Sequence, residues 1–139
     1  MMAGKESPRV PTPRLHDQIV LIVDDDEDIL SSMELAMRTE GATTITARDG
    51  TMALSHIQQQ DPDAVILDMM LPRASGLLVM EKLREFDDPP PVVMVTANEG
   101  KRHQSFAESL GVQAYLVKPV SLQRLVDTVV RLIEEDQEG

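Results

Sequence analysis

The sequence IVLIVDDDED at residues 19–28 is the most informative part of the chain about its fold, because a run of five apolar residues passes directly into a run of acids. An uninterrupted apolar run of this length is typical of a strand in a parallel sheet with helices on both faces. Asp24 and Asp25 then stand at the carboxyl end of that strand, where open α/β sheets place their ligands. The stretch therefore predicts a buried strand that ends in an acidic loop.

Short strand-like runs and helical patterns alternate along the rest of the chain. The expected strands span residues 19–23, 43–47, 64–67, 92–95 and 114–117. The expected helices lie near residues 28–40, 50–59, 76–86, 101–110 and 121–135. This alternation predicts an α/β fold, with a doubly wound parallel sheet of five strands flanked by five helices. Four strands are continuous apolar runs, whereas the polar run TTITA at residues 43–47 is expected at a sheet edge.

The helical patterns also indicate which residues form the core. Two apolar stripes at helical spacing comprise Ile29, Met33, Ala36 and Met37, and Leu122, Leu125, Val129 and Leu132. Gly41 and Gly111 stand where two helices are expected to end. The nine methionines fall on such stripes, so they are expected to fill gaps in the core rather than bind a ligand.

Length and composition fit one compact domain, because 139 residues with 42% apolar content leave no room for a second domain of normal size. Residues 17–135 are expected to form this domain. A disordered, proline-containing arm is expected at residues 1–16 and an acidic tail at residues 136–139. The chain has no cysteine, which excludes disulfides, a thiol nucleophile and Cys-based metal centres.

The charge balance separates the possible partners. With 13 basic and 24 acidic residues, the chain has a net charge of −11 that would repel a phosphate backbone, so no nucleic-acid partner is expected. The N-terminus lacks the apolar stretch of a signal peptide, and the apolar runs are too short to span a bilayer. We therefore expect a cytoplasmic protein without membrane insertion.

Polar residues of a reactive type follow four of the five expected strands. The first strand leads into Asp24 and Asp25, the third into Asp68, the fourth into Thr96 and the fifth into Lys118. If the two strands that end in Asp are neighbours, three carboxylates meet and require a cation. Oxygen ligands with room for water favour Mg²⁺, and the lysine balances the remaining charge.

Four motifs carry a resemblance to a known family. They are IVLIVDDDED at residues 19–28, VILDMMLPRASG at 65–76, VMVTAN at 93–98 and AYLVKPV at 114–120. Together they resemble the receiver domains of response regulators in two-component systems, in particular the single-domain chemotaxis regulators, and the resemblance covers residues 17–135. It implies a flavodoxin-like fold whose parallel sheet has the strand order 2-1-3-4-5.

The resemblance also implies what the residues at the strand ends do. Asp68 is the phosphoryl acceptor, which attacks a phosphohistidine or a small acyl phosphate and becomes an aspartyl phosphate. Mg²⁺ is held by Asp24, Asp25, Asp68 and the backbone carbonyl of Met70. Lys118 and the metal neutralise charge on the transferred group. The protein then catalyses only its own phosphorylation and dephosphorylation and is not an enzyme for a free substrate.

A conformational switch and a set of partners are implied as well. Thr96 moves toward the phosphoryl group and Tyr115 rotates inward, which remodels the face of the fourth helix, fifth strand and fifth helix. The Lys118–Pro119 peptide bond is expected to be cis. The expected partners are a sensor histidine kinase or histidine phosphotransferase and a downstream protein target. Because the chain ends just after the fifth helix, output through another protein is expected, with the chain a monomer or weak dimer.

Three other interpretations start from the same residues. A calcium-binding EF-hand loop also begins D-x-D-x-D, but Ile29 and Leu35 occupy the positions that need Gly and Glu. A phosphatase with an Asp nucleophile needs a second acid two residues after Asp68, where Met70 stands. A receiver-like interaction module that is never phosphorylated stays open, although the intact set of site residues argues against it.

Overall fold

A five-stranded parallel sheet forms the centre of the protein in the computed structural model, which describes residues 13–138. The strands are β1 (Ile19–Val23), β2 (Thr43–Ala47), β3 (Ala64–Leu67), β4 (Val92–Thr96) and β5 (Ala114–Val117). The helices are α1 (Glu27–Thr39), α2 (Gly50–Gln60), α3 (Gly76–Leu83), α4 (Lys101–Ser109) and α5 (Leu122–Glu138). The strand order is β2-β1-β3-β4-β5, so the predicted fold class is confirmed.

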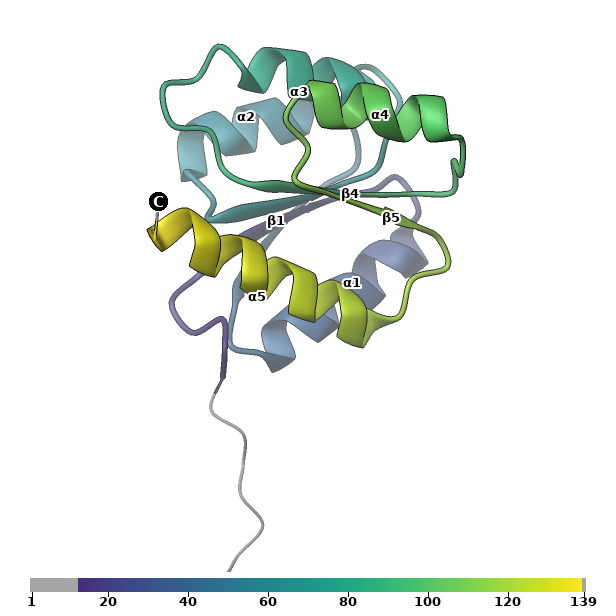
Figure 1. Ribbon diagram of the computed structural model, residues 1–139. Helices are drawn as coiled ribbons and strands as arrows, with labels where there is room; N and C mark the ends of the chain where they lie inside the picture. The colour runs from purple at the N-terminus through teal and green to yellow at the C-terminus, as the bar shows by residue number, and fades with distance from the viewer. Residues whose placement is uncertain (1–12, 139) are drawn as a thin grey trace, which may run out of the picture.

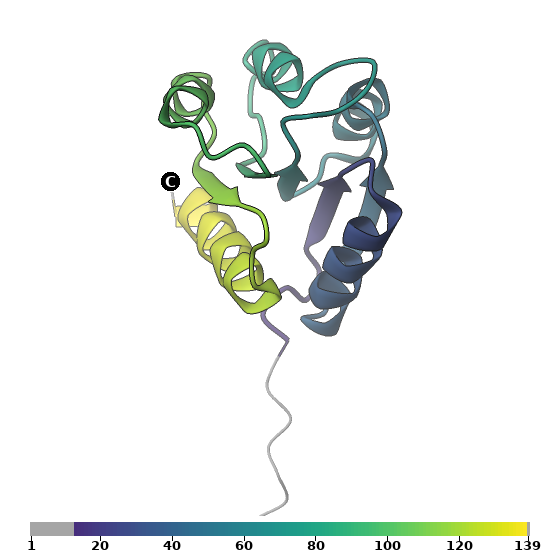
Figure 2. The ribbon, with the colours of Figure 1, turned by 90° about the vertical axis from the view of Figure 1, so that its right-hand side faces the viewer.

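Helices cover both faces of this sheet. α1 and α5 lie on one face and α2, α3 and α4 on the other (Figures 1 and 2). Two buried clusters fill the two interfaces, one containing Val20 and Ile22 of β1 and the other Leu21 and Val23. Successive side chains of a strand point to opposite faces, so a strand covered on both sides has an unbroken apolar sequence. This explains the pattern of β1, β3 and β4.

The two edge strands are less buried than the three central ones. β2 has only Ala47 fully buried, and it pairs with β1 alone, so the edge position predicted from TTITA is confirmed. β5 forms the other edge, with Leu116 buried and its three other residues partly buried. Tyr115 therefore lies on an edge strand.

Local chemistry fixes where the helices begin and end. Asp26, Asp49 and Ser75 cap α1, α2 and α3 by accepting hydrogen bonds from backbone N–H groups of the first turn. Gly41 and Gly111 follow helices with φ values of 95° and 105°, a region that glycine enters without a steric penalty. Both expected helix ends are confirmed.

The fifth helix differs from its expected form. It continues to Glu138, so residues 136–138 of the expected tail are helical, and Gly139 lies outside the described residues. Leu122 was expected in the core but is 41% exposed, because it faces the space between α1 and α5. Leu125, Val129 and Leu132 are buried as expected.

The last residues of the expected arm pack against the domain. Leu15 is buried, and its N–H donates to the Glu40 carbonyl at 2.8 Å. The Arg14 guanidinium lies 3.3 Å from the Glu40 carboxylate and 2.9 Å from that of Asp127. Residues 13–16 are thus joined to α1 and α5, while residues 1–12 of the expected arm lie outside the described residues.

The methionines are not uniformly part of the core. Met1 and Met2 lie outside the described residues. Of the seven methionines in residues 13–138, five are buried as expected: Met33, Met37, Met69, Met80 and Met94. Met52 and Met70 are 45% and 64% exposed, because one lies on the solvent side of α2 and the other in the loop after β3. Across residues 13–138, the helices are too short or too polar to cross a membrane.

Candidate functional site

An acidic cluster lies where the carboxyl ends of β1 and β3 meet. The two strands are neighbours, with Val23 opposite Leu67, so Asp24 and Asp25 follow one strand and Asp68 the other. One carboxylate oxygen from each Asp lies within 4.8 Å of the other two. Asp24 and Asp68 are buried, at 2% and 6% exposure, whereas Asp25 is exposed to solvent. The sheet order therefore brings together the three acids that the sequence singled out.

Lys118 reaches this cluster from the end of β5. Its Nζ donates to Asp24 Oδ2 at 2.7 Å and to Asp68 Oδ2 at 3.1 Å. Burial, the largest single influence, lowers the pKa of Lys118, but the hydrogen bonds and charges of the two carboxylates together outweigh it and raise the pKa. The lysine is therefore a cation held between two buried anions. The Lys118–Pro119 peptide bond is cis, as expected.

Thr96 and Tyr115 are connected through Asn98. Thr96 ends β4 and is fully buried, and its Oγ1 accepts a hydrogen bond from the Asn98 N–H at 3.4 Å. The Tyr115 hydroxyl donates to the Asn98 carbonyl at 2.7 Å. Burial and, second, the charge of Asp68 raise the pKa of the Tyr115 phenol. The sequence predicted the two end residues but not this link, because Asn98 acts through its backbone.

The loop between β3 and α3 folds tightly around Asp68. The Met70 N–H donates to Asp68 Oδ1 at 3.2 Å, and the Gly76 N–H donates to the Met69 carbonyl at 2.9 Å. A Cβ added at Gly76 would lie 2.3 Å from the Asp68 carbonyl oxygen, so only glycine fits there. The sequence motif contained this glycine without revealing the close approach that requires it.

The donor set of the cluster fits a divalent cation. The cluster holds three carboxylates and one ammonium group, so negative charge is in excess, and the exposed Asp25 offers its carboxylate oxygens toward solvent. Oxygen ligands of this kind suit hard cations that retain water in their coordination sphere. The geometry therefore describes an acidic pocket suited to a metal ion.

Comparison of the sequence with models of protein families identifies the family of this chain. The sequence model of the response regulator receiver domain matches residues 20–130. This chain belongs to that family. The resemblance inferred from the four motifs is thus confirmed, and the chain is a receiver domain of the kind found in response regulators of two-component systems.

Curated relatives of this receiver domain are bacterial regulators. It is 36% identical over 133 residues to the "Transcriptional regulatory protein PrrA" of Mycobacterium leprae, a match that covers 96% of this chain and 53% of the relative. It is 34% identical over 124 residues to the "Response regulator MprA" of Mycobacterium ulcerans, covering 86% of this chain and 53% of the relative. The chain spans about half the length of these curated relatives.

Solved receiver domains share the fold closely. A response regulator receiver domain protein, described as CheY-like, from Methanospirillum hungatei superposes with a TM-score of 0.83 at 28% identity, covering 88% of this chain and 98% of that one. The receiver domain of the Francisella response regulator 1452 gives a TM-score of 0.81 at 28% identity, covering 86% and 98% of the two chains.

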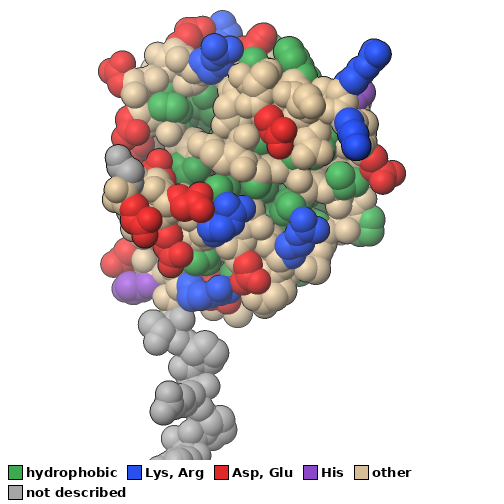
Figure 3. Space-filling view, in the orientation of Figure 1, with side chains coloured by type: hydrophobic (Ala, Val, Ile, Leu, Met, Phe, Trp, Pro, Cys, Tyr) green, Lys and Arg blue, Asp and Glu red, His purple; other side chains and the backbone are tan. Residues whose placement is uncertain are grey.

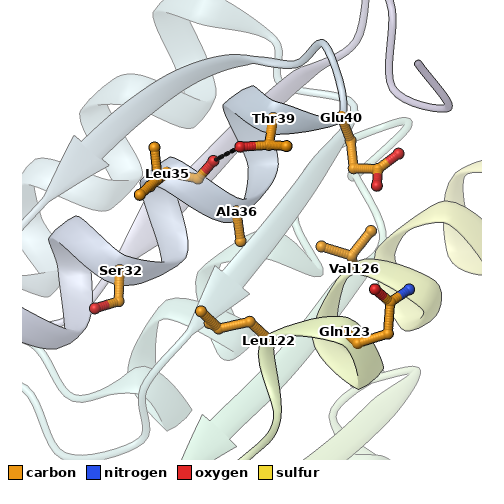
Figure 4. A pocket seen from close by; sticks show the side chains of 8 residues that line it. All are labelled: Ser32, Leu35, Ala36, Thr39, Glu40, Leu122, Gln123 and Val126. Atoms are coloured by element: carbon orange, nitrogen blue, oxygen red, sulfur yellow. Dashed lines mark hydrogen bonds between the residues drawn. The ribbon is translucent and has the colours of Figure 1, made fainter. Parts of the chain in front are cut away.

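An apolar groove runs between α1 and α5 beside the acidic cluster. A hollow of about 450 Å³ is lined by residues that include Met33, Lys118 and Pro119. A second hollow of about 330 Å³ adjoins it, and there Ala36 of α1 points toward Leu122 of α5 (Figure 4). This groove could not be predicted from the sequence, because the apolar spacing of α5 placed Leu122 in the core.

Charges on the surrounding surface are mixed. In the view of Figure 3, acidic side chains gather near the C-terminal end of α5, and the basic side chains are scattered among other residues. The described surface in this view therefore presents no single basic patch. The expectation that the domain does not bind a phosphate backbone stays a prediction.

Proposed function

We propose that this receiver domain accepts a phosphoryl group on Asp68 in a Mg²⁺-dependent reaction and passes the resulting change to a protein partner. The meeting of three carboxylates with one lysine supports this most directly. Lys118 contacts the two buried carboxylates, Asp24 and Asp68, while the third, Asp25, is exposed to the solvent from which an ion and a phosphoryl donor would approach.

The metal ligands in this proposal are oxygen atoms from both loops of the cluster. They comprise the carboxylates of Asp24, Asp25 and Asp68 and the backbone carbonyl of Met70. When bound, Mg²⁺ supplies positive charge that stabilises the phosphoryl oxygens during transfer. The excess negative charge of the cluster is the physical reason to expect such an ion.

Asp68 is the nucleophile of the proposed reaction. One of its carboxylate oxygens attacks the phosphorus atom, a new O–P bond forms, and the P–N bond to the imidazole of a donor histidine breaks. Lys118 Nζ, 3.1 Å from Asp68 Oδ2, then neutralises an oxygen of the phosphoryl group. Despite burial, the two carboxylates raise the pKa of Lys118 above the ordinary lysine value, so the side chain carries its positive charge at neutral pH.

Thr96 and Tyr115 form the proposed output switch. The Thr96 hydroxyl turns toward the phosphoryl group, which removes the acceptor of the Asn98 N–H and frees space for the Tyr115 ring. The Tyr115 hydroxyl donates a hydrogen bond to the carbonyl of the same residue, Asn98. A change at Asp68 is thus transmitted to the surface made by α4, β5 and α5.

The partners in this proposal are a phosphohistidine donor and a downstream protein. Lys118 lines the apolar groove between α1 and α5, and its Nζ lies 3.1 Å from Asp68 Oδ2, so a donor lying in the groove would bring its histidine close to Asp68. A sensor histidine kinase or a histidine phosphotransferase supplies that chemistry.

The proposal is tested by incubating the protein with Mg²⁺ and acetyl phosphate and measuring its intact mass. Gain of one phosphoryl group that is lost at alkaline pH supports an aspartyl phosphate. Absence of labelling by acetyl phosphate and by a panel of histidine kinases would favour the interaction module that is never phosphorylated.

Substitution of Asp25 by Asn is expected to weaken Mg²⁺ binding while raising thermal stability in metal-free buffer. The change removes a metal ligand and also one of three mutually repelling charges. Affinity is expected to fall by at least about tenfold, since even residues that only support metal ligands change affinity by that much. NMR titration and thermal melting with a chelator measure the two effects.

Asp28→Asn is the matched control, because Asp28 is an exposed acid of the same run within the first turn of α1. It is expected to leave Mg²⁺ affinity unchanged. Mg²⁺-induced shifts in wild-type protein that avoid Asp24, Asp25 and Asp68 would show that the metal site is elsewhere.

Beryllofluoride with Mg²⁺ is expected to change the tyrosine fluorescence of the protein. The chain has no Trp and one Tyr, so the emission reports Tyr115 alone. The ring is half-buried, and an inward rotation would bury it further and reduce quenching by iodide. Asp68→Ala is expected to remove the response. Unchanged emission and quenching with beryllofluoride bound would remove Thr96 and Tyr115 from the output path while leaving the acceptor site intact.

A further inference from the structure

Four strands end in residues of the proposed site, and β2 is the strand that does not. It leads into Arg48, Asp49 and Gly50, which contact both loops that carry the carboxylates. We propose that these three residues, here called the β2–α2 brace, position the β3–α3 loop and thereby set the affinity of the acidic cluster for divalent cations. The inference rests on the proposed function, because it assigns positioning residues to the same site.

Asp49 joins α2 to the β3–α3 loop through both of its carboxylate oxygens. Oδ1 accepts a hydrogen bond from the Met52 N–H at 2.8 Å and caps α2. Oδ2 accepts from Nε of Arg73 at 3.2 Å. Asp49 is only 8% exposed, so water cannot replace these donors fully. The buried Asp49 carboxylate therefore obtains its hydrogen bonds both from its own helix and from the β3–α3 loop.

Arg73 has an uncommon backbone conformation that needs support. Its φ is 61°. The Ala74 N–H donates a hydrogen bond to the Pro72 carbonyl at 2.9 Å, which closes a three-residue turn with Arg73 at its centre. Residues other than glycine adopt such a conformation where their surroundings hold them in it. The ion pair with Asp49 is a contact that holds Arg73 in this turn.

Gly50 allows α2 to touch the loop backbone directly. A Cβ added at Gly50 would lie 1.9 Å from the Ala74 carbonyl oxygen, a distance that no side chain tolerates. The Gly50 N–H lies 3.5 Å from the Pro72 carbonyl. The helix start and the loop thus pack backbone against backbone, which leaves the loop little freedom on that side.

Arg48 contacts the other loop of the cluster. Its Nη2 donates to the backbone carbonyl of Asp25 at 3.3 Å, and its Nη1 lies 3.8 Å from the Glu27 carboxylate. Consecutive residues of one short segment therefore reach both the loop after β1 and the loop after β3.

The brace acts on the metal site through Met70. This residue lies between Asp68, anchored by β3, and the turn at Pro72–Ala74, anchored by the brace. Its N–H already bonds the Asp68 carboxylate, and its carbonyl is a proposed metal ligand. A ligand that is held in place before binding loses less conformational freedom on binding, so loosening the turn weakens the metal complex.

Two substitutions separate this role from helix capping. Asp49→Ser keeps a good cap for α2 but removes the partner of Arg73. Arg73→Ala removes the same ion pair from the loop side. Each is expected to weaken Mg²⁺ binding by about threefold in an NMR titration, the scale of a partly exposed ion pair. Because both remove one interaction, the double variant is expected to bind no more weakly than either single one.

Rescue and control variants complete the experiment. Arg73→Lys keeps the charge and is expected to restore part of the affinity. Arg131→Ala breaks an exposed ion pair with Glu135 on α5 and is expected to leave the affinity unchanged. Amide hydrogen exchange of Met69–Ala74 in metal-free protein is expected to be faster in Asp49→Ser and Arg73→Ala than in wild type.

The outcomes distinguish the two proposals. If wild-type protein binds Mg²⁺ at Asp24, Asp25 and Asp68 but both brace variants bind it equally well, the brace is only structural and the inference is overturned. The inference is also overturned if Asp49→Ser and Arg73→Ala lower the thermal stability but leave the amide hydrogen exchange of Met69–Ala74 unchanged. A wild-type protein that shows no Mg²⁺ response at the cluster instead overturns the proposed function itself, and with it the brace.

Discussion

Replacement of Asp68 by Asn is expected to abolish phosphorylation by acetyl phosphate, measured as acid-stable and base-labile incorporation of a phosphoryl group. The amide lacks the anionic oxygen that attacks phosphorus, so no aspartyl phosphate forms. Asn keeps the size of the side chain and an oxygen for the hydrogen bond that the Met70 N–H donates at 3.2 Å. The fold should therefore persist while the chemistry is lost.

Asp26→Asn is the control for this experiment. Asp26 belongs to the acidic run after β1, but its carboxylate caps α1 by accepting from the N–H groups of Asp28 and Ile29. Asn caps a helix about as well as Asp, so labelling is expected to remain near the wild-type level. Equal labelling of wild type and Asp68→Asn would mean that Asp68 is not the acceptor.

Replacement of Lys118 by Met is expected to lower the free energy of unfolding in metal-free buffer by roughly 3 kcal/mol, the scale of breaking a buried ion pair. In the wild-type protein, Lys118 Nζ lies 2.7 Å from Asp24 Oδ2 and 3.1 Å from Asp68 Oδ2. In the variant, the two buried carboxylates have lost this ammonium group. Urea denaturation measures the loss. Saturating Mg²⁺ is expected to restore much of it, because the ion supplies positive charge to the same carboxylates.

Lys101→Met controls for the loss of a lysine in general, since Lys101 is exposed at the start of α4. Its effect on stability is expected to stay within about 0.5 kcal/mol. A Lys118→Met protein as stable as wild type in metal-free buffer would show that the two carboxylates do not depend on the lysine. Recovery by Na⁺ at matched ionic strength would show that screening, rather than a bound divalent ion, restores stability.

The central strands were the most predictable part of the fold. β1, β3 and β4 are covered on both faces, so their sequences are unbroken apolar runs, and the predicted bounds differ from the observed ones by at most one residue.

Helix ends were less predictable. α3 ends at Leu83 rather than near residue 86, because the chain beyond it turns through bonds such as Phe86 N–H to the Leu83 carbonyl. Such tight turns leave no periodic signal.

Burial at helix surfaces was predicted only in part. Met33 and Met37 are fully buried, whereas Ile29 and Ala36 of the same stripe are partly buried at the boundary of the cluster. Spacing shows which side of a helix is apolar, but the neighbouring helix decides how far that side is covered. The gap between α1 and α5 is why Leu122 stays exposed.

The amino-acid sequence shows that three acids, a threonine and a lysine stand at the carboxyl ends of apolar runs, because each is adjacent to such a run in the chain. Which of their atoms meet depends on the tertiary structure. Lys118 pairs with Asp24 and Asp68 across 94 and 50 residues, and Asp49 pairs with Arg73 across 24. Such contacts depend on the order of the strands in the sheet and on the conformation of the loops between them. The spacing of apolar residues predicts neither the strand order nor the loop conformations, because it reflects only which side of each helix or strand is covered.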